Sequence, residues 1–137
     1  MHGYEISTAR ERIDVGVVHR YLSEDAYWSP GVARAVVERA IANSLCFGLY
    51  DPEGAQAGFA RAVTDRATFA YLADVFVLEG HRGRGLGAWL VETVLAHPDL
   101  QGLRRIELAT VDAHALYERF GFAPLERVER FLAIEGA

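Results

Sequence analysis

The sequence has little of what marks a disulfide-bonded, membrane-bound or nucleic-acid-binding protein. It contains one cysteine, which excludes an intramolecular disulfide and argues against a cysteine-based metal site. It has no apolar run near the ~20 residues that a membrane-spanning helix needs, and residues 1–12 lack the apolar core of a signal peptide. Acidic residues outnumber basic ones by 19 to 14, whereas nucleic-acid-binding proteins carry a basic surface. We therefore expect a cytoplasmic protein that binds neither nucleic acid nor a membrane.

What is present fits one globular domain. The chain has 137 residues, of which 51% are hydrophobic and 24% are charged, as in ordinary soluble domains. No repeat or Pro/Gly-rich linker divides it, so we expect a single domain over residues 1–137. The histidines are scattered without the spacing of metal ligands, and we expect no metal ion.

Hydrophobic periodicity predicts the elements of the first half. Asp14 can cap a short helix that ends near Leu22, and Ser29 with Pro30 can begin a second helix. That second helix would bury five apolar residues at helical spacing: Ala33, Val36, Val37, Ala40 and Ile41. Strands are expected over residues 4–7, 45–50, 56–63 and 68–78. The last of these strands is apolar on both faces apart from Asp74, so it should lie in the middle of a sheet.

The second half continues with a helix from about Gly85 to His97 and a strand over residues 105–110. Asp112 can cap a further helix through Phe120. Gly121 then stands where a left-handed residue would end that helix, with Phe122 placed to fold back on Tyr117. Strands over residues 124–128 and 131–134 would complete the chain. Antiparallel strands with helices on their faces predict a three-layer α/β/α sandwich with a mixed, largely antiparallel central sheet.

A glycine-rich basic segment over residues 81–88 is the best candidate for chemistry. Gly83, Gly85 and Gly87 allow successive backbone N–H groups to converge on one small site. The helix that begins near Gly85 adds unpaired N–H groups and the positive end of its dipole, and Arg82 and Arg84 stand beside it. This arrangement predicts a receptor for a phosphate or a pyrophosphate.

Two other interpretations of this segment exist. The glycines could form a solvated turn between a strand and a helix. Gly83, Gly85 and Ala88, followed by Glu107, also match a dinucleotide-binding pattern. That pattern, however, follows its strand directly and opens a long βαβ series, whereas here five residues intervene and about fifty residues remain.

Two motifs resemble the GNAT superfamily of acyl-CoA-dependent N-acyltransferases. The first is Arg82-x-x-Gly85-x-Gly87, placed after the strand that contains Asp74-Val-Phe-Val77. The second follows about thirty residues on, as Ala113-x-x-Leu116-Tyr117-x-x-x-Gly121-Phe122. Both motifs occur in order and at the usual separation. The resemblance implies a GNAT-like fold and an N-acetyltransferase that uses acetyl-CoA and a primary amine.

The same resemblance implies which residues bind acetyl-CoA. The amides of the glycine-rich loop would hold the pyrophosphate; they belong to Arg82, Gly83, Arg84, Gly85, Leu86 and Gly87. The central strand would separate from its neighbour, and the pantetheine arm would pair with its backbone at Val75 and Val77. Family members often have asparagine three positions before the alanine of the second motif, and Thr110 stands there in this chain.

Catalysis in such proteins is direct transfer, without a nucleophile from the enzyme. Tyr117 corresponds to the tyrosine that protonates the departing thiolate, although it could equally be a core aromatic. Asp74 is the first candidate for the base that deprotonates the amine, on the expectation that burial raises its pKa. It could instead be a carboxylate satisfied by backbone groups or an arginine. Glu79 is the second candidate, and a water relay could also serve.

The acceptor and the assembly are less defined by the sequence. Small polyamines, aminoglycosides, amino acids and peptide or lysine amines would all suit the scaffold. Tyr21, Tyr27 and Trp28 could wall an acceptor pocket or belong to the core. A homodimer is plausible from the family likeness, and a non-catalytic module that binds acyl-CoA is the alternative function.

Overall fold

A computed structural model describes residues 1–136 and is built around a five-stranded sheet. The strands are β1 (Glu5–Ser7), β2 (Leu45–Tyr50), β3 (Gln56–Thr64), β4 (Phe69–Val77) and β5 (Arg105–Glu107). They lie side by side in the order β1-β2-β3-β4-β5. The first four strands are antiparallel to their neighbours, and β5 is parallel to β4. The sheet is therefore mixed and largely antiparallel, as the sequence predicts.

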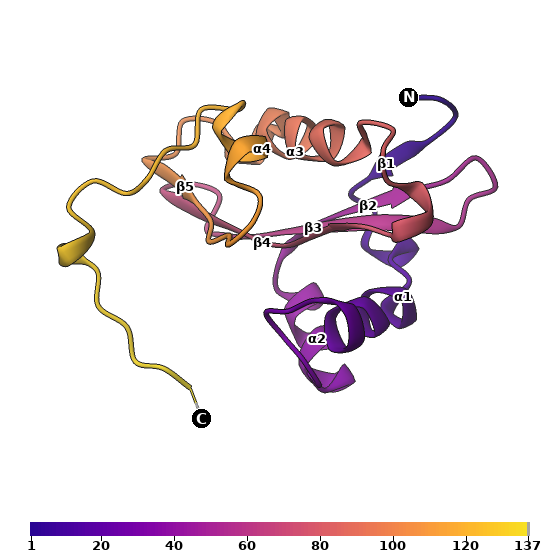
Figure 1. The fold of residues 1–137 in the computed structure, drawn as a ribbon, viewed down its shortest axis with the longest axis horizontal. Helices are drawn as coiled ribbons and strands as arrows, with labels where there is room; N and C mark the ends of the chain where they lie inside the picture. The colour runs from indigo at the N-terminus through magenta and orange to yellow at the C-terminus, as the bar shows by residue number, and fades with distance from the viewer. Residues whose placement is uncertain (137) are drawn as a thin grey trace.

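Helices cover both faces of this sheet (Figure 1). The α-helices are α1 (Val15–Arg20), α2 (Arg34–Ala42), α3 (Leu86–Ala96) and α4 (His114–Glu118), and a π-helical turn (Tyr21–Asp25) continues α1. Short 3₁₀ turns lie at Arg10–Arg12, Glu79–His81, Pro98–Leu100 and Val128–Arg130. The first two α-helices pack on one face and the last two on the other. The predicted α/β/α sandwich is confirmed.

Each face of the sheet has its own hydrophobic core. Leu90 and Val91 of α3 pack with Phe47 of β2 on one side. On the other side, Val18 of α1 and other helix residues pack against a cluster that includes the cysteine, Cys46. Burial of this much apolar surface on both faces fixes the sheet as the central layer.

The two N-terminal helices begin differently from one another. The carboxylate of Asp14 accepts a hydrogen bond from the Val17 amide at 3.2 Å, which confirms the predicted cap of α1. The prediction that Ser29 caps α2 is wrong, because α2 begins at Arg34. The Ser29 hydroxyl instead donates to the Leu22 carbonyl at 2.8 Å, so it closes the loop back onto the preceding helix.

The last helix is shorter than predicted, because α4 ends at Glu118 and not at Phe120, but the predicted turn after it is confirmed. Asp112 does not cap α4; the Thr110 hydroxyl accepts the Ala113 amide at 3.1 Å instead. Gly121 has the predicted positive φ of 97°. The Phe122 amide donates to the Tyr117 carbonyl at 3.3 Å, and the two rings meet edge to face with centroids 5.7 Å apart. The chain therefore folds back on Tyr117 as the sequence predicts.

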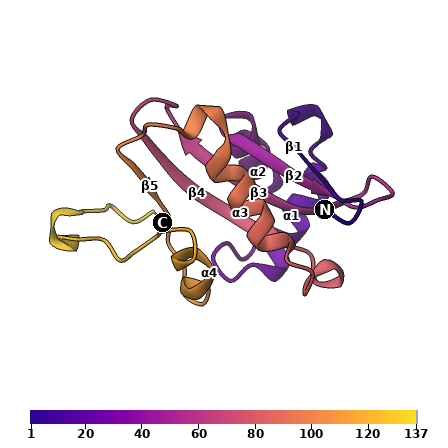
Figure 2. The same ribbon diagram turned by 90° about the horizontal axis from the view of Figure 1, so that it is seen from above.

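The C-terminal segment departs most from the prediction. The strand expected over residues 105–110 is shorter, because β5 ends at Glu107. Residues 124–128 and 131–134 are not strands, and a 3₁₀ turn at Val128–Arg130 separates them. Residues 124–136 form an arm that extends away from the sandwich (Figures 1 and 2). Strand-forming side chains need a neighbouring strand, and this arm has none within residues 1–136.

Two further features concern the described residues as a whole. None of their helices is long and apolar enough to cross a membrane. Nowhere within residues 1–136 do three histidine, cysteine or acidic side chains gather in a way that could hold a metal ion.

Candidate active site

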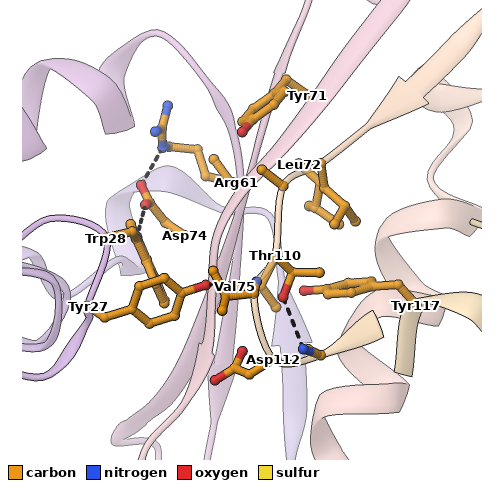
Figure 3. A pocket seen from close by; sticks show the side chains of 15 residues that line it. Tyr27, Trp28, Arg61, Tyr71, Leu72, Asp74, Val75, Thr110, Asp112 and Tyr117 are labelled. Carbon is orange, nitrogen blue, oxygen red and sulfur yellow. Dashed lines mark hydrogen bonds and ion pairs between the residues drawn. The ribbon is translucent and has the colours of Figure 1, made fainter. Parts of the chain in front are cut away.

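The cleft of the protein opens where β4 and β5 part. Their parallel pairing runs from Phe69 opposite Arg105 to Tyr71 opposite Glu107. Beyond this point β4 continues to Val77, whereas β5 has ended. A cleft of about 530 Å³ lies between β4 and the segment that follows β5 (Figure 3). The edge of β4 that β5 leaves uncovered forms one side of this cleft.

A β-bulge in β4 lies at the same place. The register between β3 and β4 shifts between Phe59 and Arg61. Asp74, inside the bulge, has a φ of +55°, which is costly for a residue with a side chain. A bulge bends the strand and re-aims its side chains. This accounts for the separation of β4 from β5 and for the entry of Asp74 into the lining of the cleft.

Both oxygens of the Asp74 carboxylate have partners. Arg61 Nε on β3 lies 2.9 Å from Oδ2, and Trp28 Nε1 donates to Oδ1 at 3.0 Å. Arg61 Nη1 also donates to the Ser44 hydroxyl at 3.1 Å. The arginine pairing that the sequence left open for Asp74 is therefore present. The carboxylate links β3, β4 and the loop that carries Trp28.

Tyr117 enters the cleft from the opposite side, on α4. Its side chain is 8% exposed, and its hydroxyl points into the cleft toward Thr110 (Figure 3). Burial, with smaller contributions from Tyr27 and Asp112, raises the pKa of Tyr117 to about 12. The phenol therefore keeps its proton at any physiological pH. A group of this kind can donate a proton to an atom that becomes negative during a reaction.

Two aromatic residues from the loop after the π-helical turn wall the cleft. Tyr27 and Trp28 meet edge to face with ring centroids 5.1 Å apart. They are 54% and 42% exposed, so they line a surface rather than a core. The Tyr27 hydroxyl also accepts the Val111 amide at 3.2 Å, which ties this loop to the far side of the cleft. The expectation that both flank a pocket fits their positions.

Tyr21, unlike Tyr27 and Trp28, does not line the cleft. Its ring stacks on Phe76 with centroids 4.0 Å apart, and its hydroxyl accepts a hydrogen bond from Arg82 Nη2 at 3.1 Å. Glu79, the second candidate for a base, belongs to the 3₁₀ turn after β4 and does not line the cleft.

The glycine-rich loop follows directly from the end of β4. Gly83 and Gly85 have positive φ values of 82° and 77°, which glycine adopts without strain. Gly85 is the N-cap of α3, and no side chain caps the helix there. A Cβ atom at Gly83 would meet nothing within 4 Å. The loop thus presents uncapped helical N–H groups beside an open surface, which suits an anion.

The side chains of Arg82 and Arg84 make hydrogen bonds that fix the shape of the glycine-rich loop. Arg82 Nε donates to the Val77 carbonyl at 2.9 Å. Arg84 Nη1 donates to the Tyr4 hydroxyl at 2.9 Å, and that hydroxyl lies 2.7 Å from His81 Nδ1. Tyr4 is separated from these partners by almost eighty residues. Sequence reasoning missed this contact because nothing in the local pattern around Tyr4 points to it.

Comparison with known proteins identifies the family. The model of the acetyltransferase (GNAT) family matches residues 17–122. The chain belongs to the GNAT family. A Gibberella zeae protein named as a provisional acetyltransferase is 33% identical, and the match covers 83% of this chain and 75% of that protein. The protein is therefore an acyltransferase enzyme of a family that generally uses acetyl-CoA.

Solved GNAT structures share its architecture. A GNAT-family protein of Xanthomonas campestris pv. campestris is 50% identical, with a TM-score of 0.94, and the match covers 97% of this chain and 93% of that one.

More distant structures share the fold alone. Glucosamine-6-phosphate N-acetyltransferase from Arabidopsis thaliana is 14% identical, with a TM-score of 0.66, covering 98% of this chain and 97% of that one. At this identity the likeness says nothing about the acceptor of the GNAT protein described here.

Proposed function

We propose that this GNAT protein transfers the acetyl group of acetyl-CoA directly to a primary amine, on a small molecule or on a peptide, as one domain over residues 1–137. The observation that carries the proposal is the cleft at the parting of β4 and β5. It brings together an unpaired strand edge, the protonated phenol of Tyr117 and the carboxylate of Asp74. An acyl donor, a proton donor and a proton acceptor can meet in such a space.

The glycine-rich loop would hold the pyrophosphate of acetyl-CoA. The amides that we assign to it belong to Arg82, Gly83, Arg84, Gly85, Leu86 and Gly87. Support comes from the uncapped N-terminus of α3 and from the two left-handed glycines that precede it. Helix N-termini favour anions through their free N–H groups and the helix dipole. The side chains of Arg82 and Arg84 would fix the shape of the loop through Val77 and Tyr4.

The uncovered edge of β4 would bind the pantetheine arm. Backbone groups at Val75 and Val77 lie beyond the last pairing with β5, so an extended ligand could pair with them as an added strand. The Val77 carbonyl accepts a hydrogen bond from Arg82 Nε, and its second lone pair stays available. Bound there, acetyl-CoA would supply a thioester whose acyl carbon reacts with amines.

Tyr117 would act as the general acid. The amine nitrogen forms a bond to the acyl carbon, the carbon–sulfur bond breaks, and Tyr117 donates its proton to the departing sulfur. A pKa of about 12 suits this role, because the phenol is fully protonated before the step. A positioned acid contributes roughly 10²–10⁴-fold to rate. Positioning of both substrates by the cleft supplies the rest.

Asp74 would accept the proton that the amine loses. Its oxygens already accept bonds from Arg61 and Trp28, yet a carboxylate has about four lone-pair sites, so a further proton donor can still approach. The left-handed backbone holds Asp74 in the lining of the cleft, and the exposed rings of Tyr27 and Trp28 would flank the acceptor. These rings and the carboxylate favour an acceptor that arrives as an ammonium cation.

Two measurements test the proposal. Calorimetric titration with acetyl-CoA should give saturable one-site binding, and its absence at millimolar ligand would contradict the proposal. A panel of primary amines, including polyamines, aminoglycosides, amino acids and lysine peptides, should then include at least one that releases CoA. Tight binding of acetyl-CoA without turnover on any amine would indicate a binding protein instead.

A further inference from the structure

A small apolar pocket lies between the two N-terminal helices and the sheet, outside the cleft. It has a volume of about 140 Å³ and is lined by residues of α1, the π-helical turn, α2 and β3. The buried part of its lining consists of Val18, Leu22, Val37, Ile41 and Phe59. Val36 in the same lining is 51% exposed, so the pocket reaches the surface of the molecule. A pocket of this kind accepts an apolar group more readily than water.

The pocket and the cleft meet at the ion pair of Arg61 and Asp74. These two residues, and no others within residues 1–136, line both spaces. Trp28 lines the cleft and Ser29, the next residue, lines the pocket, so their loop crosses the same boundary. Figure 3 shows the Asp74 carboxylate between Arg61 and Trp28 at this point. The carboxylate that we propose as the base therefore lies at the boundary between the cleft and an apolar space.

The polar groups of the pocket lining leave one place for a cation. They are the Ser29 hydroxyl, the Arg61 guanidinium and the Asp74 carboxylate. The hydroxyl donates to the Leu22 carbonyl, and the guanidinium pairs with Asp74 Oδ2 and donates to the Ser44 hydroxyl. Asp74 is the only acid among the described residues of this lining, and a carboxylate has about four lone-pair sites. An ammonium group can therefore bind Asp74, while the rest of the lining offers apolar contacts.

We propose that this pocket binds the carbon skeleton of the acceptor, and that the acceptor is a primary amine with one compact apolar group. The inference rests on the proposed function and narrows the class of its amine. The ammonium group of the acceptor binds Asp74 at the boundary, with its nitrogen on the side of the cleft. The apolar group extends in the opposite direction, among Val37, Ile41 and Phe59. The transfer step itself is unchanged.

The size and the lining of the pocket select among amines. A cavity of about 150 Å³ lined by leucine, isoleucine and phenylalanine accepts one benzene ring. The pocket of about 140 Å³ therefore suits one ring or a branched chain of roughly four to six carbons. Each CH₂ group that leaves water strengthens binding by about fourfold. A second ammonium group would instead lose its water among apolar side chains. Phenylalkyl and branched alkyl amines are therefore better acceptors than polyamines or aminoglycosides.

The first test measures the binding of two amines of similar length. The probes are 2-phenylethylamine and 1,4-diaminobutane, titrated calorimetrically into the wild-type protein with and without CoA. We expect 2-phenylethylamine to bind ~10-fold more tightly or better. In NMR spectra of the complex, its ring protons should show nuclear Overhauser contacts to the methyl groups of Val37 and Ile41. No saturable binding of 2-phenylethylamine, equal or tighter binding of the diamine, or ring contacts confined to Tyr27 and Trp28 would overturn the inference.

Two matched substitutions on α2 test the pocket itself. Ala40 is half-buried in its lining, whereas Ala35 of the same helix is exposed and does not line it. Ala40→Leu fills part of the pocket and should weaken the binding of 2-phenylethylamine by ~10-fold or more. Ala35→Leu makes the same chemical change with little effect on helix propensity and should bind as the wild type does. A folded Ala40→Leu variant with wild-type affinity would overturn the inference. If thermal unfolding shows that Ala40→Leu is not folded, the ring contacts in the wild-type complex decide the case.

Neither test depends on turnover, so the inference and the proposed function can fail separately. If 2-phenylethylamine binds in the pocket but no amine releases CoA from acetyl-CoA, the proposed function is wrong and the pocket remains a binding site for apolar amines. If polar amines are acetylated and 2-phenylethylamine does not bind, the proposed function stands and the inference about the pocket is wrong.

Discussion

Arg61 Nε lies 2.9 Å from the Oδ2 atom of Asp74, and Asp74 is the left-handed residue of the β4 bulge. The two side chains are 18% and 13% exposed, so the pair is largely shielded from water. Removing one member of such a pair leaves the other charge uncompensated. The pair therefore holds a costly backbone conformation at the point where β4 leaves β5. Trp28 connects the same carboxylate to the wall of the cleft.

The first prediction concerns Asp74 as a base. Asp74→Asn keeps an oxygen that can accept from Trp28 but removes the proton acceptor, so kcat/KM at neutral pH should fall by roughly 10²–10⁴-fold. The defect should shrink as the pH approaches the pKa of the amine, because the acceptor then arrives already deprotonated. The measurement is kcat/KM against pH for both proteins.

A matched control addresses the structural role of the same carboxylate. Trp28→Phe removes the hydrogen bond that Trp28 Nε1 donates to Asp74 Oδ1, leaves Arg61 on Oδ2, and keeps an aromatic wall. It should raise the KM for the amine with little change in the pH profile. If Asp74→Asn shows a loss that is the same at every pH, Asp74 positions the cleft and is not the base.

The second prediction concerns Tyr117 as an acid. Tyr117→Phe should lower kcat by about 10²-fold or more and leave acetyl-CoA affinity unchanged, because the ring still packs against Phe122. The acid is active in its protonated form, and burial raises its pKa to about 12. Its deprotonation therefore causes no fall in rate below about pH 11. Turnover by Tyr117→Phe at the wild-type rate would make Tyr117 a core residue.

The third prediction uses two glycines that lie two residues apart. Gly85 has a φ of +77°, so Gly85→Ala should cost about 1–2 kcal/mol of stability and weaken acetyl-CoA binding by distorting the loop. Gly87 lies inside α3, and a Cβ there would make an ordinary contact of 4.0 Å with Val77. Gly87→Ala should therefore stabilise the fold by up to about 1 kcal/mol. Chemical unfolding measures the stability of both variants, and calorimetric titration measures their affinity for acetyl-CoA. A Gly85→Ala variant as stable as Gly87→Ala would contradict the prediction.

The fourth prediction concerns the turn between β3 and β4. The Asp65 carboxylate accepts hydrogen bonds from the Thr68 hydroxyl and from the amides of Ala67, Thr68 and Phe69, which hold its pKa well below the usual value. Its contribution to stability is complete above the unfolded pKa of about 4 and is lost as the pH falls toward the folded value. Asp65→Ala should lower the unfolding temperature at pH 7. The difference in unfolding temperature between Asp65→Ala and the wild type should narrow below pH 4. A difference that stays constant with pH would argue against a stabilising role of the ionised Asp65 carboxylate.

Much of the fold follows from local patterns, and the rest depends on distant partners. The β-branched and aromatic residues of the segment over residues 68–78 locate β4, and Gly121 with Phe122 locates the turn that follows α4, because these signals are local. The start of α2 was missed because the Ser29 hydroxyl bonds to Leu22 instead of to its own helix. Residues 131–134 have the composition of a strand but have no neighbour within residues 1–136. The composition of a segment indicates its tendency to form a strand, but it does not show whether another strand lies beside it.

The candidate site divides in the same way. The glycine-rich loop can be located from the sequence because its backbone has positive φ angles, which glycine adopts more readily than other residues. Asp74 stood out because it is a charge in an apolar strand. Its partner Arg61 could not be found, since the register of β3 against a bulged β4 decides the pair. Whether Asp74 and Tyr117 act as base and acid stays a prediction for kinetics.

The buried cysteine has a practical consequence for these experiments. Cys46 is 3% exposed, and burial raises the pKa of its thiol to about 11. Thiol reagents react with thiolates. They should therefore react with the CoA that the enzyme releases and leave the buried thiol of Cys46 in the folded protein unmodified. Once the chain unfolds, the same thiol becomes reactive. The rate at which Cys46 is labelled would then report how often the whole sandwich opens, with no introduced probe.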